Sequence, residues 1–370
     1  MSTSIFVVRA HLRYHAIPGE TCCCSETAIA RSRDRGTRKS SPKFILNTRK
    51  IMRFFKQAVA LGILGGAIAP SVGMACSACG CTLNSDWASQ GLAASGGWRF
   101  DMRYDFFEQD QLRSGTDSVR RSDLTFPTDQ EVQQDTINRN YTFALDYSPN
   151  KDWGFTAVLP WFDRSHATIA EGDMQVSTSH DRGIGDLRLM ARYSGFDAQR
   201  GAGIQFGIKL PTGRFTSPFD GGPQQGELLD RGLQLGTGTT DLLLGVYKFA
   251  ALTPDWGYFG QLQLQQPLNS REDFKPGTGV NFNLGLRYTA KATFVPQVQI
   301  NARVEKREQG AEADIENSGA TLVYLSAGGT WNISARFSAY AFVQAPVYQR
   351  VNGLQIEATR LGSVGVHYHF

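Results

Sequence analysis

The stretch Trp98-Arg-Phe-Asp-Met-Arg-Tyr-Asp-Phe106 alternates without a break between apolar and charged residues. Successive side chains of a β-strand point to opposite faces, so this stretch predicts a strand with one apolar face and one charged face. A single such strand fits a soluble sandwich, whose charged face meets water. It fits equally a membrane barrel, whose apolar face meets lipid.

The same alternation returns many times before Phe370. It is clearest in residues 141–147, 186–193, 280–288 and 297–305, and all such segments together give twelve candidate strands. Several approach the roughly 9 to 11 residues that a tilted strand needs to cross a bilayer. An even number of strands is usual in a single-chain bacterial barrel.

The links between these segments alternate in length, as in a membrane barrel with short periplasmic turns and long outer loops. Nothing in the architecture of a β-sandwich requires long and short links to alternate. We therefore predict an all-β fold, a transmembrane up-and-down antiparallel β-barrel of about twelve strands over residues 97–370. The long links are expected near residues 110–137, 165–183, 213–238, 269–279, 308–320 and 350–359, and the short turns at 148–152, 196–200, 253–255, 290–292 and 333–336.

Aromatic residues stand at or near the ends of the proposed strands, which predicts the aromatic girdle of a membrane barrel. The C-terminus alternates through Val364, Val366 and Tyr368 to Phe370. It resembles the last strand of outer-membrane proteins, which the barrel-assembly machinery recognises through a final aromatic residue. Tyr368 and Phe370 are therefore the predicted assembly signal, and outer-membrane lipid and that machinery are the expected partners. A buried terminal Phe in a soluble fold is the alternative.

Positive charge gathers at the N-terminal end of a chain whose net charge is +4. Residues 1–51 hold ten Lys or Arg against three Asp or Glu, whereas residues 76–370 carry about −5. Because the part expected to fold is mildly acidic, a nucleic-acid partner is not predicted.

An export signal is expected between the basic end and the strands. Met52-Arg-Phe-Phe-Lys56 is a basic n-region, residues 58–68 form a short apolar h-region, and Gly73-Met-Ala75 is a small-x-small cleavage site. A transmembrane helix would need about 20 apolar residues, and Pro70 ends the run too early. The expected organisation is a disordered upstream extension from a start site placed too early (1–51), a signal peptide (52–75), a periplasmic Cys-rich segment (76–96) and the barrel (97–370).

The charged face of the alternation is predicted to line the lumen of the barrel. Such a wall must be hydrated or paired across strands. It could be salt-bridge rungs that fill a narrow barrel, or it could surround a small water-filled pathway for a modest solute. The predicted lining residues are Arg99, Asp101, Arg103, Asp105, Asp146, Arg188, Arg192, Lys209, Arg287, Arg303 and Glu305.

Three motifs carry a family resemblance: Gly183-Ile-Gly-Asp-Leu187, Gly207-Ile-Lys-Leu-Pro-Thr-Gly213 and Leu235-Gly-Thr-Gly-Thr-Thr-Asp241. With Leu159-Pro160-Trp161, they resemble the barrel proteins called "MetA-pathway of phenol degradation" transporters. The resemblance covers roughly residues 97 to 370. It implies an outer-membrane barrel, and it implies aromatic or other hydrophobic small molecules as solutes.

Cleavage after Ala75 would place Cys76, Cys79 and Cys81 at a new N-terminus. Soft thiolates at this spacing can hold Cu(I) or Zn(II). In the oxidising periplasm two of them can instead form a disulfide and leave an odd thiol, and lipidation of Cys76 is a third alternative.

The sequence predicts a non-enzyme without a required cofactor. The motif His-x-Ser-Asn-Gly, typical of the outer-membrane phospholipase, does not occur in it. The predicted function is a transporter or channel for a small solute, with a Cys segment that binds a soft metal as an added hypothesis. The alternative is a structural or metal-sensing envelope protein whose barrel is closed.

Overall fold

The alternating stretch at Trp98 becomes β1 in the computed structural model, which describes residues 83, 90, 96–196, 198–291 and 293–370. The predicted upstream extension and signal peptide lie outside the described residues. So do Cys76, Cys79 and Cys81, for which metal binding is predicted. Within the described residues, no helix has both the length and the apolar character to span a membrane.

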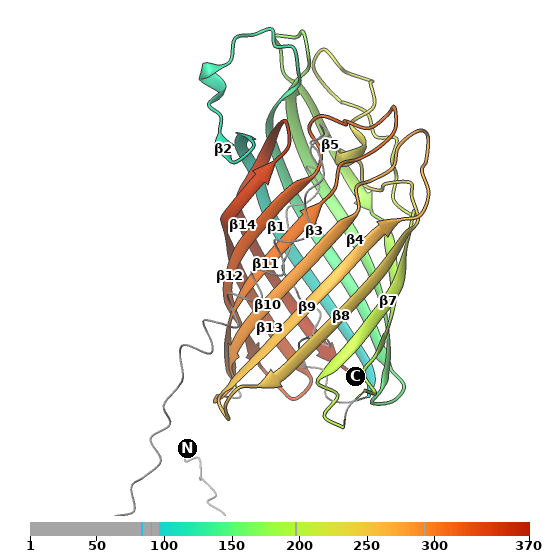
Figure 1. The fold of residues 1–370 in the computed structure, drawn as a ribbon, viewed down its shortest axis with the longest axis vertical. Coiled ribbons are helices and arrows are strands. Elements are labelled where there is room, and N and C mark those ends of the chain that lie inside the picture. Colours follow the sequence, from blue (N-terminus) through green and yellow to red (C-terminus); the bar gives the residue numbers. More distant parts are fainter. Residues whose placement is uncertain (1–82, 84–89, 91–95, 197, 292) are drawn as a thin grey trace, which may run out of the picture. The chain divides into compact units, whose positions relative to one another are not determined.

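Twelve of the fourteen strands in the described residues form one closed wall (Figure 1). Each pairs antiparallel with the next along the chain, and β14 pairs with β1 from Arg99↔His369 to Ser114↔Leu354. The predicted twelve-stranded up-and-down barrel is confirmed. Its strands are β1 (Gly97–Ser114), β3 (Val132–Ser148), β4 (Trp153–Ile169), β6 (Leu187–Tyr193), β7 (Ala202–Leu210), β8 (Asp241–Ala251), β9 (Trp256–Pro267), β10 (Gly279–Tyr288), β11 (Phe294–Glu305), β12 (Ala320–Asn332), β13 (Phe337–Val351) and β14 (Leu354–His369).

The two faces of the wall are inverted relative to a water-soluble protein. Outward apolar side chains are exposed, with Val343 at 68% and Val364 at 52%, whereas inward Arg99 and Asp105 are 4% and 2% exposed. Exposed apolar belts of this size are stable only in contact with hydrocarbon, and an edgeless sheet leaves no backbone group unpaired there. The barrel is therefore a transmembrane barrel of the bacterial outer membrane.

Aromatic side chains pair along the rim that carries the short turns. Trp98 stacks on Tyr147 with ring centroids 4.5 Å apart, and Trp256 lies 5.1 Å from Tyr288. Phe294 with Trp331 continues the series at 4.8 Å. Each pair joins the start of one strand to the end of its neighbour, which is the position expected of an interfacial girdle.

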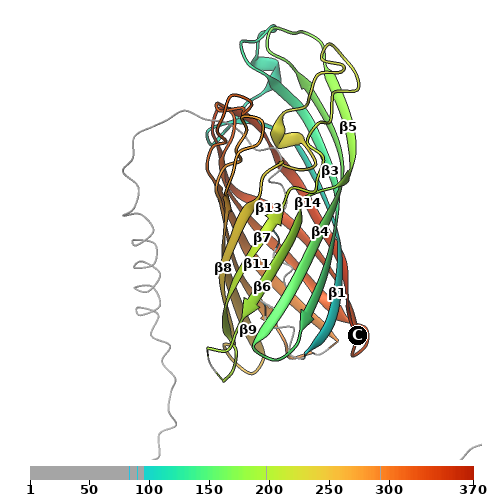
Figure 2. The ribbon, with the colours of Figure 1, turned by 90° about the vertical axis from the view of Figure 1, so that its right-hand side faces the viewer.

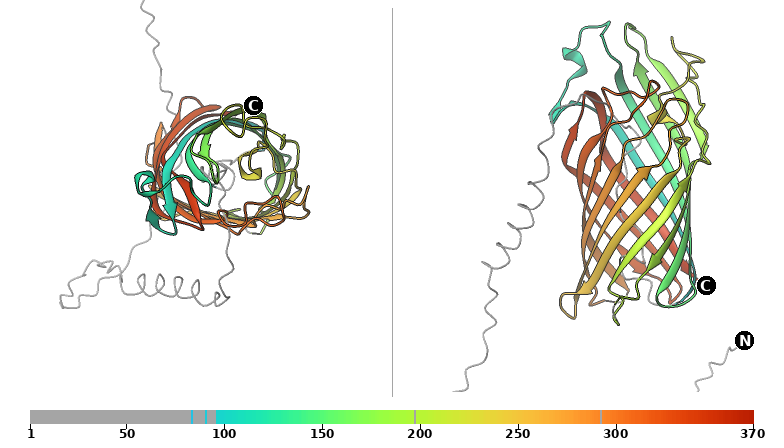
Figure 3. Two further views of the ribbon diagram at one scale, coloured as in Figure 1. Left: turned by 90° about the horizontal axis from the view of Figure 1, so that it is seen from above. Right: turned by 45° about the vertical axis from the view of Figure 1, so that its right-hand side comes forward.

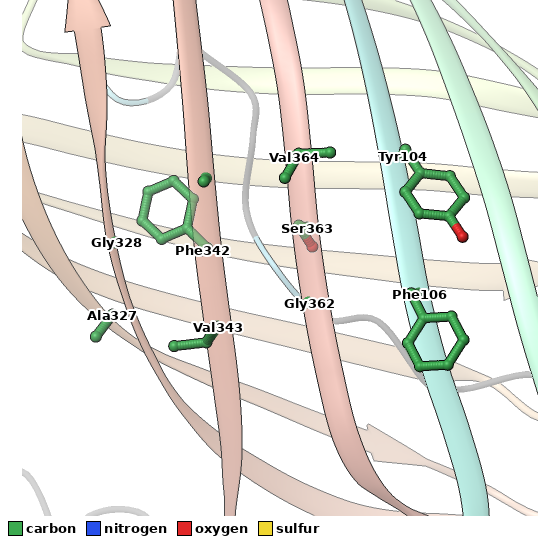
Figure 4. A pocket seen from close by; sticks show the side chains of 10 residues that line it. Tyr104, Phe106, Ala327, Gly328, Phe342, Val343, Gly362, Ser363 and Val364 are labelled. Carbon is green, nitrogen blue, oxygen red and sulfur yellow. The ribbon is translucent and has the colours of Figure 1, made fainter.

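The outer wall also carries a shallow apolar groove of about 460 Å³ (Figure 4). Tyr104 and Phe106 on β1 form one side of the groove and Val343 on β13 forms the other. Gly362 on β14 lies between these two sides, and Ala327 on β12 belongs to the lining beyond Val343. The groove opens on the face that meets lipid.

Two predicted long links are wrong. Residues 165–183 are mostly strand: β4 continues to Ile169 and pairs with β5 (Ser177–Ile184) from Trp161↔Ile184 to Thr168↔Ser177. Residues 350–359 also belong to strands, because β13 and β14 meet at a tight turn in which Gly353 has φ +52°. The extension formed by β4 and β5 has mostly polar residues on both faces, so the apolar alternation fades there while the backbone pairing continues. At the start of β14, Leu354 and Ile356 alternate with Gln355 and Glu357 and pack against Leu112 and Val132.

The remaining links follow the prediction. Short turns occupy 149–152, 194–201, 252–255, 289–293 and 333–336, and long loops occupy 115–131, 211–240, 268–278 and 306–319. The first long loop contains β2 (Asp117–Ser118) and the 3₁₀ turn η1 (Arg121–Asp123). Figure 2 shows that β3, β4 and β5 rise higher than the neighbouring strands at the long-loop rim.

Residues 211–240 form an inward loop. It contains the 3₁₀ turn η2 (Arg231–Leu233) and has its own core of Phe219, Leu229 and Leu233. Seen from above, η2 lies inside the ring of strands (Figure 3). Arg164 Nη1, on the inner face of β4, donates a hydrogen bond of 2.6 Å to the carbonyl of Leu233. The loop is thereby attached to the inner wall.

Candidate functional site: the barrel lumen

A buried ion network crosses the inner wall near the short-turn rim. Asp146 on β3 accepts a hydrogen bond of 2.9 Å from Arg99 Nε on β1 and one of 3.1 Å from Arg192 Nη2 on β6. The hydroxyl of Thr156 on β4 donates to the same carboxylate at 2.7 Å. Side chains from four strands therefore meet at one carboxylate, because their inward positions come level at this height.

The inner face of β1 carries further paired charges. Asp101 accepts hydrogen bonds of 3.0 and 3.1 Å from Tyr340 Oη on β13. Arg103 Nε donates to Asp105 at 2.8 Å, and Arg103 Nη1 donates to the carbonyl of Leu83 at 3.3 Å. Leu83 therefore lies against the inner wall, with 6% of its surface exposed.

The three sequence motifs converge at a second buried charge cluster. Lys209 Nζ lies 3.0 Å from Asp186 Oδ2 and 3.0 Å from Asp241 Oδ2. The backbone amides of Gly213 and Thr237 each donate to Asp186 at 3.0 Å. This cluster fixes both ends of the inward loop to β6, β7 and β8.

Two glycines of those motifs allow the backbones to approach closely. A Cβ on Gly236 would lie 2.5 Å from the carbonyl oxygen of Gly213, and a Cβ on Gly213 would lie 2.7 Å from the Cα of Gly236. Any side chain would separate the two ends of the loop and move the amides away from Asp186.

Two inward arginines form no salt bridge in the described part of the chain. Arg188 on β6 is exposed and has no hydrogen bond or ion pair there, and the charges of Arg303, Asp241, Asp186 and Arg103 act on it from a greater distance. Arg287 on β10 is 8% exposed, and its Nε and Nη1 atoms have no hydrogen-bond partner among the residues that the structure describes. Arg303 differs from both, since its Nε donates to Glu305 at 2.9 Å.

A further part of the lumen wall, from β7 to the middle of β12, contains a chain of neutral side chains that the charge pattern does not predict. Gln261 Nε2 donates to Gln205 at 2.8 Å, and Asn301 Nδ2 donates to Asn283 Oδ1 at 2.7 Å. The chain of hydrogen bonds continues from Gln261 to Asn283 and from Asn301 to Ser326. The alternation of Gln and Asn with apolar residues in β9, β10 and β11 was the available signal.

Every predicted lining residue projects from the inner face of a barrel strand, and the structure joins most of them in the networks described above. Their role in lining an open pathway stays a prediction. Tyr368 and Phe370 are 36% and 63% exposed beside the girdle, and their recognition by the assembly machinery also stays a prediction. Among the described residues, no group of three or more His, Cys, Asp or Glu side chains is arranged to hold a metal ion.

Comparisons with known proteins support the fold. No protein-family model and no curated protein matches the chain. The COG4313 outer membrane channel from Pseudomonas putida F1 matches with a TM-score of 0.55 and 11% identity over 74% of this chain and 96% of that chain. Lower TM-scores, 0.40 and 0.43, are found for the CymD monoaromatic hydrocarbon channel (9% identity, 81% and 98% coverage) and the β domain of the Bordetella autotransporter BrkA (14% identity, 75% and 100% coverage).

At these identities the likeness concerns the fold, and only the first of the scores supports a shared fold. A channel barrel is the fold that the motif resemblance implies. The suspected family and the observed architecture therefore agree.

Proposed function

We propose that the barrel is an outer-membrane channel for small organic anions, and that Arg188 is the residue that receives the anionic group. The main support for this proposal is that Arg188 faces the lumen, is exposed, and has no ion pair in the described residues. Rings of arginine select anions in other pores because they replace part of the hydration that the ion loses. Channel neighbours of the same fold support the coarser statement of a barrel channel.

The balance of charge in the lumen supports the preference for anions. Asp146 lies between Arg99 and Arg192, and Asp186 and Asp241 are joined to Lys209. The two clusters together contain three carboxylates and three cations, so Arg188 and Arg287, which form no salt bridge in the described residues, add positive potential to the lumen. A low-dielectric wall concentrates that potential on the pathway.

The aromatic solutes implied by the motif resemblance fit this proposal when they carry a carboxylate. Arginine can hold a carboxylate with two parallel hydrogen bonds, while the ring passes the neutral amide wall. A purely hydrocarbon solute would gain nothing from Arg188.

The test is the reversal potential of the refolded barrel in a planar bilayer under a KCl gradient at pH 8. We expect selectivity for anions, and Arg188→Gln with Arg287→Gln should shift the reversal potential toward cations. Lys151→Gln is the matched control, because it removes the same charge from an exposed short turn. A barrel that passes no current at any pH, or an unshifted reversal potential in the double variant, would contradict the proposal.

A closed structural or metal-sensing barrel is the second candidate. It is favoured by the attachment of the inward loop to Arg164 and by the deep burial of Asn301 and Ser326, which are both 0% exposed. Absence of current, together with unchanged solute uptake after deletion of the gene, would favour it.

For the cysteine segment we propose soft-metal binding by Cys76, Cys79 and Cys81. The support is the spacing of three thiols within six residues. Titration with Cu(I) under reducing conditions should give tight binding that each Cys-to-Ser change weakens. Unchanged affinity across the series would exclude the role.

A further inference from the structure

Arg287 is a buried cation on the inner wall of the barrel. It is the next-to-last residue of β10, so it lies beside the short turn 289–293, on the rim expected to face the periplasm. It is 8% exposed, and among the described residues it forms no salt bridge and its Nε and Nη1 atoms have no hydrogen-bond partner. A guanidinium can only donate, and N–H groups left unpaired away from water cost free energy. The side chain therefore has unused capacity to bind an anion.

The immediate neighbours of Arg287 do not use that capacity. Gly257 on β9 is its register partner, and a Cβ there would lie 3.2 Å from Arg287 Nε, so the guanidinium rests on the wall at this glycine. On the other side, the register partner on β11 is Gln297, which is neutral and 4% exposed. Neither neighbour supplies a negative charge. A carboxylate in the lumen would supply both the charge and the acceptor atoms that they lack.

An aromatic patch adjoins Arg287 on the inner face of β8 and β9. It consists of Tyr247, Phe249 and Phe259. Phe249 and Phe259 are register partners, and the rings of Tyr247 and Phe249 stack with centroids 6.4 Å apart. The ring of Phe259 covers Gly285 of β10, where a Cβ would lie 2.2 Å from its Cζ atom. Because Gly285 is two residues before Arg287 on the same face of β10, the patch and the guanidinium occupy adjacent positions of one wall.

The two parts of this wall match the two ends of an aromatic acid. Phe249 keeps part of its surface exposed, whereas Phe259 and Tyr247 are 0% and 5% exposed. A solute ring can therefore pack on Phe249, with the other two rings supporting it from the wall. Rotation of the long Arg287 side chain toward the lumen would let its guanidinium hold the carboxylate through two parallel hydrogen bonds. A hydrocarbon would use only the patch, and an inorganic anion only the arginine.

We propose that Arg287 and the aromatic patch form a binding site for aromatic carboxylates at the short-turn end of the lumen. This inference rests on the proposed function, a channel for small organic anions, and it adds a solute class and a second position on the path. Arg188 is the second residue of β6, at the end away from the short turn, whereas Arg287 stands at the short-turn end of β10. A solute that enters from the long-loop rim would meet Arg188 first and Arg287 last.

Calorimetric titration of the full chain in lipid nanodiscs tests the site, with sodium benzoate and sodium acetate as probes at pH 8 and constant ionic strength. The Arg188→Gln protein is the starting point, so that binding at Arg188 does not contribute. We expect it to bind benzoate roughly tenfold more tightly than acetate. Adding Arg287→Gln should weaken benzoate binding roughly tenfold or more. Adding Phe249→Leu should lower the affinity for benzoate to that for acetate and leave acetate binding unchanged.

Two control variants make the same substitutions outside the site. Arg336→Gln changes an exposed arginine in another short turn of the same rim, and Phe206→Leu changes a ring on the lipid-facing side of β7 that is 41% exposed. Both should bind benzoate as the Arg188→Gln protein does. Because the charge of Arg287 has no salt bridge in the described residues, Arg287→Gln should not lower the urea midpoint of unfolding without benzoate. That measurement separates loss of binding from loss of the fold.

Equal affinities for benzoate and acetate in the Arg188→Gln protein would overturn the site. So would an unchanged benzoate affinity after Arg287→Gln, or displacement of benzoate by an equal concentration of chloride, since the ring would then contribute nothing. The titration requires no current. Binding at Arg287 can therefore fail in a barrel that selects anions, and it can hold in a barrel whose reversal potential does not shift.

Discussion

The lumen has two unlike walls, one built from charges and one from amides. The charged wall spans β1, β3, β6 and β7, where Asp146 and Lys209 each join ions from several strands. The amide wall is the middle of β9 to β12, where Gln261 and Asn301 continue a neutral chain of hydrogen bonds, while Arg287 and the Arg303–Glu305 pair stand toward the strand ends. Both walls are buried and polar, yet we expect the removal of one ion-pairing or hydrogen-bonding side chain to destabilise them to different degrees.

The difference follows from what remains after one side chain is removed. In the charged wall an unmatched buried ion remains, and its desolvation is not compensated. In the amide wall a neutral group remains, which can turn toward another amide or toward water. We therefore expect that removing one side chain lowers the free energy of unfolding more in the charged wall than in the amide wall.

The largest loss in the free energy of unfolding is expected at Asp146, the centre of the ion network in the charged wall. Asp146→Asn keeps the shape of the side chain but removes the carboxylate charge that Arg99 and Arg192 share, which should lower the free energy of unfolding by about 3 to 5 kcal/mol. Urea unfolding in lipid vesicles, followed by tryptophan fluorescence, measures it. Asp152→Asn is the control: its pair with Arg200 is exposed, so the loss should stay below about 1 kcal/mol.

A smaller loss in the free energy of unfolding is expected at Lys209, because backbone amides also stabilise the charge of Asp186. Lys209→Met leaves Asp186 and Asp241 facing each other, but the amides of Gly213 and Thr237 still donate to Asp186. We expect a loss of about 2 kcal/mol in the free energy of unfolding and faster hydrogen exchange in the inward loop. Lys291→Met, in an exposed short turn, should change neither quantity. An inward loop that exchanges as in wild type would show that the cluster does not hold it.

The smallest effect is expected in the amide wall. Asn301→Ala removes hydrogen bonds to Asn283 and Ser326 but leaves only neutral groups. The free energy of unfolding should fall by about 1 to 2 kcal/mol in the same urea experiment. If this loss equalled that of Asp146→Asn, the distinction between the two walls would be wrong.

How well the sequence predicted each region depended on its surroundings. Strands inside the lipid showed strict alternation, so β1 and β10 were recognisable from residues 98–106 and 280–288. The extension of β4 was missed because its residues are mostly polar on both faces, whereas the start of β14 was missed although Leu354 and Ile356 alternate there with Gln355 and Glu357. Charged lining residues such as Arg99 were found through their alternation with aromatics. The amide wall was missed because Gln and Asn carry no charge to mark them.

The sequence by itself determined the closed barrel and which faces point inward, because lipid on one side and a polar lumen on the other impose a period of two along every strand. Only the tertiary structure decided which inward groups are matched. Arg188 and Arg192 lie on the same face of the same strand, yet Arg192 meets Asp146 and Arg188 has no ion pair in the described residues. The register between strands distant in sequence sets that difference.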